Sequence, residues 1–106
     1  MKLIAHRGLY KNKDEQNTLK AFFNAVKNDN YVGFECDIRE TKDKKFIINH
    51  DAFIGEQLIK FTNFRNLKSK NILKLSDVLK INTDKIMLLE IKDINIDINK
   101  FNKPIL

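Results

Sequence analysis

Apolar residues recur at helical spacing in one segment near the N-terminus. After Asn17 they fall at intervals of three and four residues, at Leu19, Phe22, Phe23 and Val26. This spacing predicts an amphipathic helix that buries these four side chains in the core. Asn17 or Thr18 can cap its start, because either side chain can accept a hydrogen bond from the first turn.

Four other apolar runs are too short for helices and predict strands, at residues 2–5, 32–38, 46–48 and 86–91. They are nearly continuous in apolar character, and helical patterns separate them in two places. This favours a parallel sheet covered on both faces over an antiparallel meander, so the predicted fold class is α/β. Ser76 is expected to cap a second, shorter helix. Residues 51–74 show no clear period.

The length limits the architecture. A complete eight-stranded α/β barrel needs about 200 residues or more, so a chain of 106 residues cannot contain one. No apolar run approaches the roughly 20 residues of a membrane span, and the first residues lack the apolar segment of a secretory signal. We therefore expect a cytoplasmic protein with no membrane span. The lone cysteine, Cys36, excludes an internal disulfide and is expected to pack in the core.

The basic residues are spread along the chain rather than clustered. The net charge is +6, but only three of the 20 basic residues are arginines. Because direct readout of bases relies on arginine, no nucleic-acid partner is predicted. One charged segment is interpreted as a solvated turn, with Arg39, Glu40, Lys42 and Lys44 facing water.

Ionisable residues gather at or just past the C-terminal end of each predicted strand. In chain order they are His6 and Arg7, Glu35 and Asp37, His50 and Asp51, and Glu90 and Lys92. In parallel α/β sheets this edge is where ligands bind. Side chains alternate along a strand, so Glu35 and Asp37 share one face while Cys36 points to the other. The pattern predicts one polar site at the carboxyl edge of the sheet.

Glu35, Asp37 and Glu90 lie in apolar strands, where unpaired charges are costly to bury. Lys92 and Arg7 can compensate part of this charge. Three oxygen ligands without a thiolate suit a hard cation, so the pattern predicts a Ca²⁺ or Mg²⁺ site. Because imidazole ordinarily titrates near neutrality, His6 and His50 are candidates for a general base and a general acid. A histidine at a strand end is by itself usually structural; it is the shared edge that favours a site.

Five short motifs in order resemble one family. They are His6-Arg7-Gly8, Asn17-Thr18-Leu19 with Ala21-Phe22, Glu35-Cys36-Asp37 with Thr41-Lys42-Asp43, His50-Asp51, and Glu90-Ile91-Lys92. Over about residues 2–92 the chain resembles the N-terminal half of a glycerophosphodiester phosphodiesterase. It departs from the family at Gln16, where a glutamate is usual; the amide keeps hydrogen-bonding capacity but loses a charge.

The resemblance implies a metal-dependent hydrolase with a TIM-barrel fold that cleaves glycerophosphodiesters to glycerol 3-phosphate and an alcohol. It implies His6 and His50 as the acid/base pair, and Arg7 and Lys92 as the groups that neutralise phosphate oxygens. The divalent metal ligands it implies, for Ca²⁺ or Mg²⁺, are Glu35, Asp37 and Glu90. The expected partner is therefore a small-molecule glycerophosphodiester.

Family members are more than twice as long. We therefore expect residues 1–106 to form a truncated domain, a partial (β/α)₈ barrel of about the first four parallel strands with their helices. Its open edges invite self-association. Two alternatives stay open: a catalytically inactive remnant or interaction module of the same family, and related chemistry on another phosphodiester headgroup.

Overall fold

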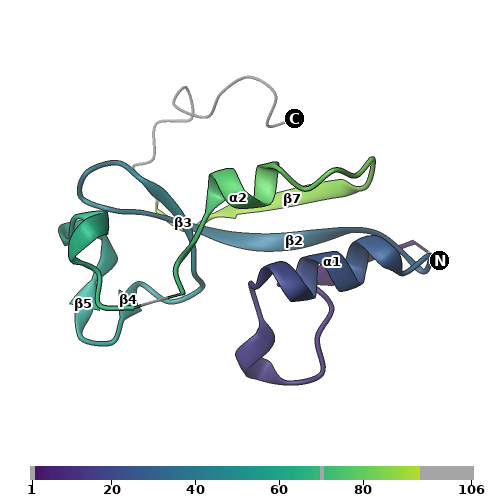
Figure 1. The fold of residues 1–106 in the computed structure, drawn as a ribbon, viewed down its shortest axis with the longest axis horizontal. Helices are drawn as coiled ribbons and strands as arrows, with labels where there is room; N and C mark the ends of the chain where they lie inside the picture. The colour runs from purple at the N-terminus through teal and green to yellow at the C-terminus, as the bar shows by residue number, and fades with distance from the viewer. Residues whose placement is uncertain (1, 70, 94–106) are drawn as a thin grey trace.

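The computed structural model describes residues 2–69 and 71–93, arranged around one long central strand (Figure 1). This strand, β2, is Tyr31–Glu40, and the helix that packs beside it, α1, is Leu19–Lys27. The other strands are β1 Leu3–His6, β3 Phe46–Ile48, β4 Phe53–Ile54, β5 Gln57–Leu58, β6 Leu73–Lys74 and β7 Ile86–Ile91. A second helix, α2, is Leu75–Leu79, and 3₁₀ turns lie at Lys13–Glu15, Ile59–Phe61 and Phe64–Asn66.

β2 has a parallel neighbour on each side. β1 and β7 both pair with the same stretch of β2, so they lie on opposite sides of it; Ile4 and Ile86 are both opposite Gly33. Gly33 allows β2 and β7 to approach closely, because a Cβ at this position would lie 2.1 Å from the carbonyl oxygen of Ile86. These parallel strands, with helices against the sheet, confirm the predicted α/β class.

The prediction of four parallel strands is wrong for residues 46–48. β3 runs antiparallel to the end of β2, with Ile38 opposite Ile48. The cause is the short connection, a tight turn over residues 41–45 in which the Thr41 N–H donates to the Lys45 carbonyl (2.9 Å). A parallel return would need a crossover of about a dozen residues or more. β3 therefore runs back along β2 to the level of Asp37, whose carbonyl accepts from the Asn49 N–H (3.0 Å).

The segment without a clear sequence period consists of many short elements. β6 pairs antiparallel with β3, while β4 and β5 form a separate two-stranded ribbon. A small apolar cluster of Ile47, Ile59 and Leu67 holds this segment together. Elements of two or three residues are too short to show periodicity, so the pattern could not reveal them.

The main core lies between the sheet and the helices. Phe22 of α1 stacks on Phe34 of β2 with ring centroids 4.6 Å apart. Cys36 is fully buried in this core, as predicted, and burial raises the pKa of its thiol to about 12. The expectation that Phe23 is buried is wrong, because its side chain is 44% exposed. The fully buried residues of α1 are Ala21, Phe22 and Ala25, so Phe23 lies beside the buried face of the helix and not on it.

The two helix starts differ from each other. The Thr18 hydroxyl accepts from the Ala21 N–H (3.2 Å), so Thr18 is the cap of α1, one of the two predicted candidates. The prediction that Ser76 caps α2 is wrong, because α2 begins at Leu75 and Ser76 lies inside its first turn. The Asp77 carboxylate accepts from the Lys74 N–H (3.0 Å) instead.

The opposite face of the sheet is open. Among the strands that the structure describes, β1 and β7 each pair with β2 alone, and the barrel is not closed. Ile86 and Leu88 on β7 are 54% and 53% exposed, and Ile4 on β1 is 37% exposed. Within residues 2–69 and 71–93, no helix is long and apolar enough to cross a membrane.

Candidate active site

Three carboxylates meet on the open face near the C-terminal end of the parallel ladder between β2 and β7. Asp37 lies opposite Glu90 in the parallel ladder, and Glu35 is two residues earlier on the same face of β2. Glu35, Asp37 and Glu90 each offer an oxygen within 4.8 Å of the others. Asp37 is fully buried and Glu35 is 5% exposed, whereas Glu90 faces solvent. The structure thus brings the three predicted metal ligands together.

Two cationic side chains flank this cluster. The Arg7 Nε lies 3.3 Å from Asp37 Oδ2, and the Lys92 Nζ lies 3.4 Å from Asp37 Oδ1. Lys92 Nζ also donates to Glu90 Oε1 (2.9 Å). Asp37 is therefore held between two positive charges, which offset the cost of burying it.

The two glutamates of the cluster have pKa values shifted in opposite directions. Burial, together with the neighbouring carboxylates of Glu90 and Asp37, raises the pKa of Glu35 to about 7, and the Arg7 backbone N–H limits this rise. Lys92 lowers the pKa of Glu90 to about 2. Near neutral pH the cluster therefore carries an incompletely ionised Glu35 and an ionised Glu90.

Two buried oxygens in the cluster accept no hydrogen bond: Glu35 Oε2 and Asp37 Oδ1. Asp37 Oδ1 lies near the Lys92 ammonium (3.4 Å) without a hydrogen bond to it. Buried carboxylate oxygens normally accept a hydrogen bond, so both oxygens have coordination capacity left for a cation. The donor set is oxygen only, which fits Ca²⁺ or Mg²⁺ and does not fit a soft metal. The residues present therefore fit a hard divalent ion.

His6 and Arg7 reach the cluster from β1. His6 ends the strand, and its Nε2 lies 3.9 Å from Glu35 Oε1 with the side chain 64% exposed. Arg7 has a left-handed backbone (φ 59°), which turns the chain so that its N–H donates to Glu35 Oε1 (3.0 Å). Gly8 follows at φ 88°, where a Cβ would lie 2.5 Å from the Ala21 Cβ. The turn is thus bound both to α1 and to the cluster.

His50 follows the antiparallel strand β3 and reaches the same end of the sheet. Its Nδ1 lies 2.9 Å from Asp51 Oδ1, and its side chain is 43% exposed. The Asp51 carboxylate, rather than one of the three clustered carboxylates, is thus the hydrogen-bond partner of the His50 ring. The route of the chain differs from the predicted one, yet the hydrogen bond between Asn49 and Asp37 keeps this segment beside the cluster.

Two residues that sequence analysis gave no role in the site hold it from the loop before α1. Asn17 Nδ2 donates to Asp37 Oδ2 (2.9 Å), and its Oδ1 accepts from the Asp37 N–H (3.3 Å). Gln16 accepts from Arg7 Nη1 (2.9 Å) and donates to the Tyr10 hydroxyl (2.7 Å). The available signal was the family motif Asn17-Thr18-Leu19 and the position of Gln16 directly before it. Asn17 was interpreted as a possible helix cap, which gave no indication of its contact with Asp37.

The interpretation of Arg39 and Glu40 as part of a solvated turn is wrong. Both belong to β2, where Glu40 is 8% exposed and the Arg39 side chain is 17% exposed. Lys42 and Lys44 are exposed in the turn, as predicted. β2 is longer than its apolar run, because pairing with β3 extends it through charged residues.

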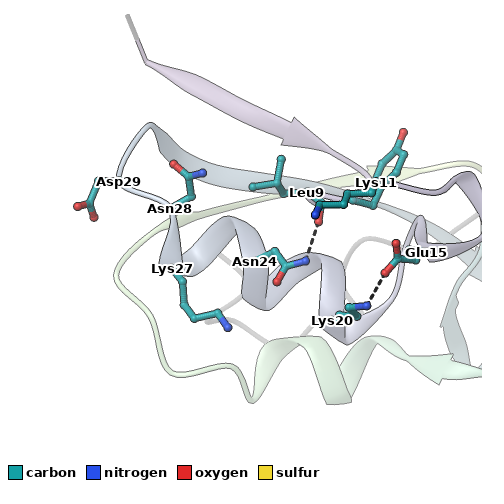
Figure 2. Close-up of a pocket in the computed structure, with 9 residues that line it drawn as sticks. Leu9, Lys11, Glu15, Lys20, Asn24, Lys27, Asn28 and Asp29 are labelled. Atoms are coloured by element: carbon teal, nitrogen blue, oxygen red, sulfur yellow. Dashed lines mark hydrogen bonds and ion pairs between the residues drawn. The ribbon is translucent and has the colours of Figure 1, made fainter.

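A separate cleft lies between α1 and the loop after β1 (Figure 2). It has a volume of about 860 Å³ and is lined mainly by polar side chains, Lys20 and Asn24 among them. Lys20 pairs with Glu15 (2.8 Å), and Asn24 donates to the Leu9 carbonyl (3.1 Å), both drawn as dashed lines in Figure 2. None of the predicted site residues lines this cleft, so it is distinct from the carboxylate cluster.

The model of the glycerophosphoryl diester phosphodiesterase family matches residues 6–103. The chain belongs to this family. A solved glycerophosphodiester phosphodiesterase from Thermotoga maritima is 29% identical, with a TM-score of 0.67, and the match covers 85% of this chain and 43% of that one. A solved structure titled as a putative glycerophosphodiester phosphodiesterase from Galdieria sulphuraria shares the fold at 21% identity and a TM-score of 0.68, over 89% of this chain and 44% of that one.

No curated protein matches the chain. The chain spans less than half the length of the two solved structures. The resemblance to the N-terminal half of a family member is therefore confirmed, and so is the partial barrel. The described strands supply three parallel barrel strands rather than four.

Proposed function

We propose that this chain carries the metal and proton-transfer site of a glycerophosphodiester phosphodiesterase, which yields glycerol 3-phosphate and an alcohol. The observation that carries the proposal is the meeting of Glu35, Asp37 and Glu90 within 4.8 Å at the end of parallel strands. The family match adds the substrate class. Two features distinguish this cluster from an acidic surface patch. Two of its buried oxygens accept no hydrogen bond, and two cationic side chains lie beside Asp37.

Glu35, Asp37 and Glu90 would hold the divalent ion, Ca²⁺ or Mg²⁺. When bound, the ion supplies positive charge that polarises the phosphoryl oxygens and lowers the pKa of a nearby hydroxyl. Asp37 keeps its position through the amide of Asn17, so the ligand geometry is set before the ion binds. Arg7 and Lys92 extend the positive field toward the phosphate oxygens of the substrate.

His6 and His50 would move the protons. One imidazole removes the proton from the glycerol hydroxyl next to the phosphodiester, and that oxygen attacks phosphorus. The bond between phosphorus and the alcohol breaks, and the other imidazole donates a proton to the leaving alkoxide. A cyclic phosphate results; water then opens it, with the proton roles exchanged, to release glycerol 3-phosphate. Both side chains are partly exposed, so substrate and water can reach them.

The direct test is release of glycerol 3-phosphate from glycerophosphocholine by the purified chain with Ca²⁺ or Mg²⁺. Glu35→Gln should abolish both the activity and the metal response, while Glu56→Gln, an exposed glutamate in the β4–β5 turn, is the matched control. His6→Ala or His50→Ala should lower turnover by about 10²-fold without unfolding the chain. A folded chain that binds neither ion and releases no product would contradict the proposal and favour the inactive remnant.

The open face supports self-association as part of this function. Ile86 and Leu88 are half exposed beside the carboxylate cluster, and the edges of β1 and β7 have no further partner among the strands described. Pairing of these edges between copies would cover the apolar side chains and exclude water from the site. Sedimentation should show a concentration-dependent dimer that Leu88→Asp abolishes and Leu79→Asp, at an exposed site on α2, preserves. A monomer at all concentrations would contradict it.

A further inference from the structure

Arg39 connects two segments that lie far apart in the sequence. Its Nη2 donates to the backbone carbonyl of His50 (2.7 Å), and its Nη1 lies 3.4 Å from Asp93 Oδ1. One guanidinium therefore contacts the chain after β3 and the chain after β7. Both contacts are shielded, because the side chains of Arg39 and Asp93 are 17% and 20% exposed.

Asp93 is itself held in place. Its Oδ2 accepts from the Glu40 N–H (2.6 Å), so the carboxylate bridges the backbone of β2 and the Arg39 side chain. One residue earlier, the Lys92 N–H donates to the Ile38 carbonyl (3.0 Å) and continues the ladder between β2 and β7. The anchor for Arg39 is thus part of the same ladder that carries Glu90 and Lys92.

Local hydrogen bonds hold the backbone on either side of His50. β3 is only three residues long, and His50 and Asp51 lie beyond its end. The Asn49 N–H donates to the Asp37 carbonyl (3.0 Å), and the Asn49 side chain donates to the Asp51 carbonyl (2.8 Å). The contact to the His50 carbonyl itself comes from Arg39. A charge-assisted hydrogen bond from a planar, anchored guanidinium is the kind of contact that restricts such a backbone to one position.

We propose that Arg39 is a positioning residue for His50: together with Asp93 it sets the distance between the His50 imidazole and the carboxylate cluster. The proposal deepens the proposed function, since it rests on His50 as one of the two proton-transfer groups. Arg39 touches neither substrate nor metal in this scheme. Its effect passes through the backbone carbonyl of His50, so it should change the chemical step and leave metal binding intact.

The test compares Arg39→Gln with Lys42→Gln, which removes an exposed positive charge from the adjacent turn. Arg39→Gln should lower kcat by about 10-fold or more, because small displacements of a catalytic group are costly. KM and the affinity for Ca²⁺ should stay within about twofold, and Lys42→Gln should change none of the three. Arg39→Lys keeps the positive charge but lacks the planar guanidinium that contacts two groups at once. Its kcat should therefore fall between those of Arg39→Gln and the unsubstituted chain.

A second readout does not depend on turnover. In ¹H–¹⁵N spectra, Arg39→Gln should shift or broaden the His50 imidazole resonances and leave those of His6 unchanged. Asp93→Asn, which removes only the anchoring charge, should produce the same change to a smaller degree, and it replaces Arg39→Gln if that variant does not fold. If the chain proves inactive, the proposed function fails while the spectra still decide this inference. Unchanged His50 resonances, or equal losses of kcat and Ca²⁺ affinity, would overturn it.

Discussion

The two faces of the sheet are packed to different degrees. On the helix-covered face, Phe22, Phe34, Cys36 and Ile38 are fully buried in one continuous core. On the other face, Ile86 and Leu88 are half exposed, and the buried residues beside them are carboxylates. One face therefore supplies stability, and the other carries buried carboxylates at an energetic cost. The comparison predicts that substitutions on the two faces act on different properties.

The largest effect is expected from the packed face. Phe34→Ala removes a fully buried ring that stacks on Phe22 and should lower the free energy of unfolding by about 3–5 kcal/mol. Leu88→Ala, on the open face, should cost less than about 1 kcal/mol, because half of its side chain already contacts water. Urea unfolding monitored by circular dichroism measures both values at a low protein concentration. Similar losses for the two variants would show that the open face is covered in solution.

The second-largest effect is expected from metal binding at the open face, which should stabilise the folded state. At an ion concentration about 100 times its Kd, Ca²⁺ or Mg²⁺ should raise the free energy of unfolding by about 2.7 kcal/mol. Asp37→Asn should remove this gain, because it neutralises the buried ligand between Arg7 and Lys92. Thermal unfolding with and without each ion, with chelator as the reference, is the measurement. An equal gain in Asp37→Asn would place the ion elsewhere.

The pH dependence of the stability of the metal-free chain should come from the same face. The pKa of Glu35 is raised from 4.5 to about 7, so the folded state binds this proton more tightly than the unfolded state. Its contribution to stability is complete below pH 4.5 and is lost as the pH rises through 7. Glu90, with a pKa lowered to about 2, acts in the opposite direction and only below its ordinary pKa of 4.5.

Stability between pH 5 and pH 7.5 should therefore fall in the metal-free chain. Glu35→Gln should flatten this fall, because the amide does not titrate. Urea unfolding at several pH values in chelator tests this directly. A fall of the same size in Glu35→Gln would mean that another group titrates in this range.

The smallest effect concerns the helices that cover the packed face. Thr18→Ala removes the hydroxyl that accepts from the Ala21 N–H and should cost about 1 kcal/mol. Ser76→Ala should be neutral or slightly stabilising, since Ser76 lies inside α2 and alanine has the higher helix propensity. The pair of unfolding free energies separates the true cap from the residue that only resembles one.

The local sequence pattern was sufficient to predict features that depend on a single helix or strand. The spacing from Leu19 to Val26 predicted α1, and alternation along 35–37 predicted that Glu35 and Asp37 face away from Cys36. It failed for Phe23 and for Arg39, because burial depends on which neighbour covers a residue and not on the residue itself. Periodicity also gave no information on residues 51–74, where the elements are too short.

The amino-acid sequence by itself determined the α/β class, the family motifs and the residue types that can bind a hard cation, because these follow from local spacing and side-chain chemistry. Only the tertiary structure decided that β3 turns back, that Asn17 holds Asp37, and that Arg39 joins the His50 segment to Asp93. Strand direction and long-range contacts depend on how separate segments pack together, and that packing is a property of the whole fold.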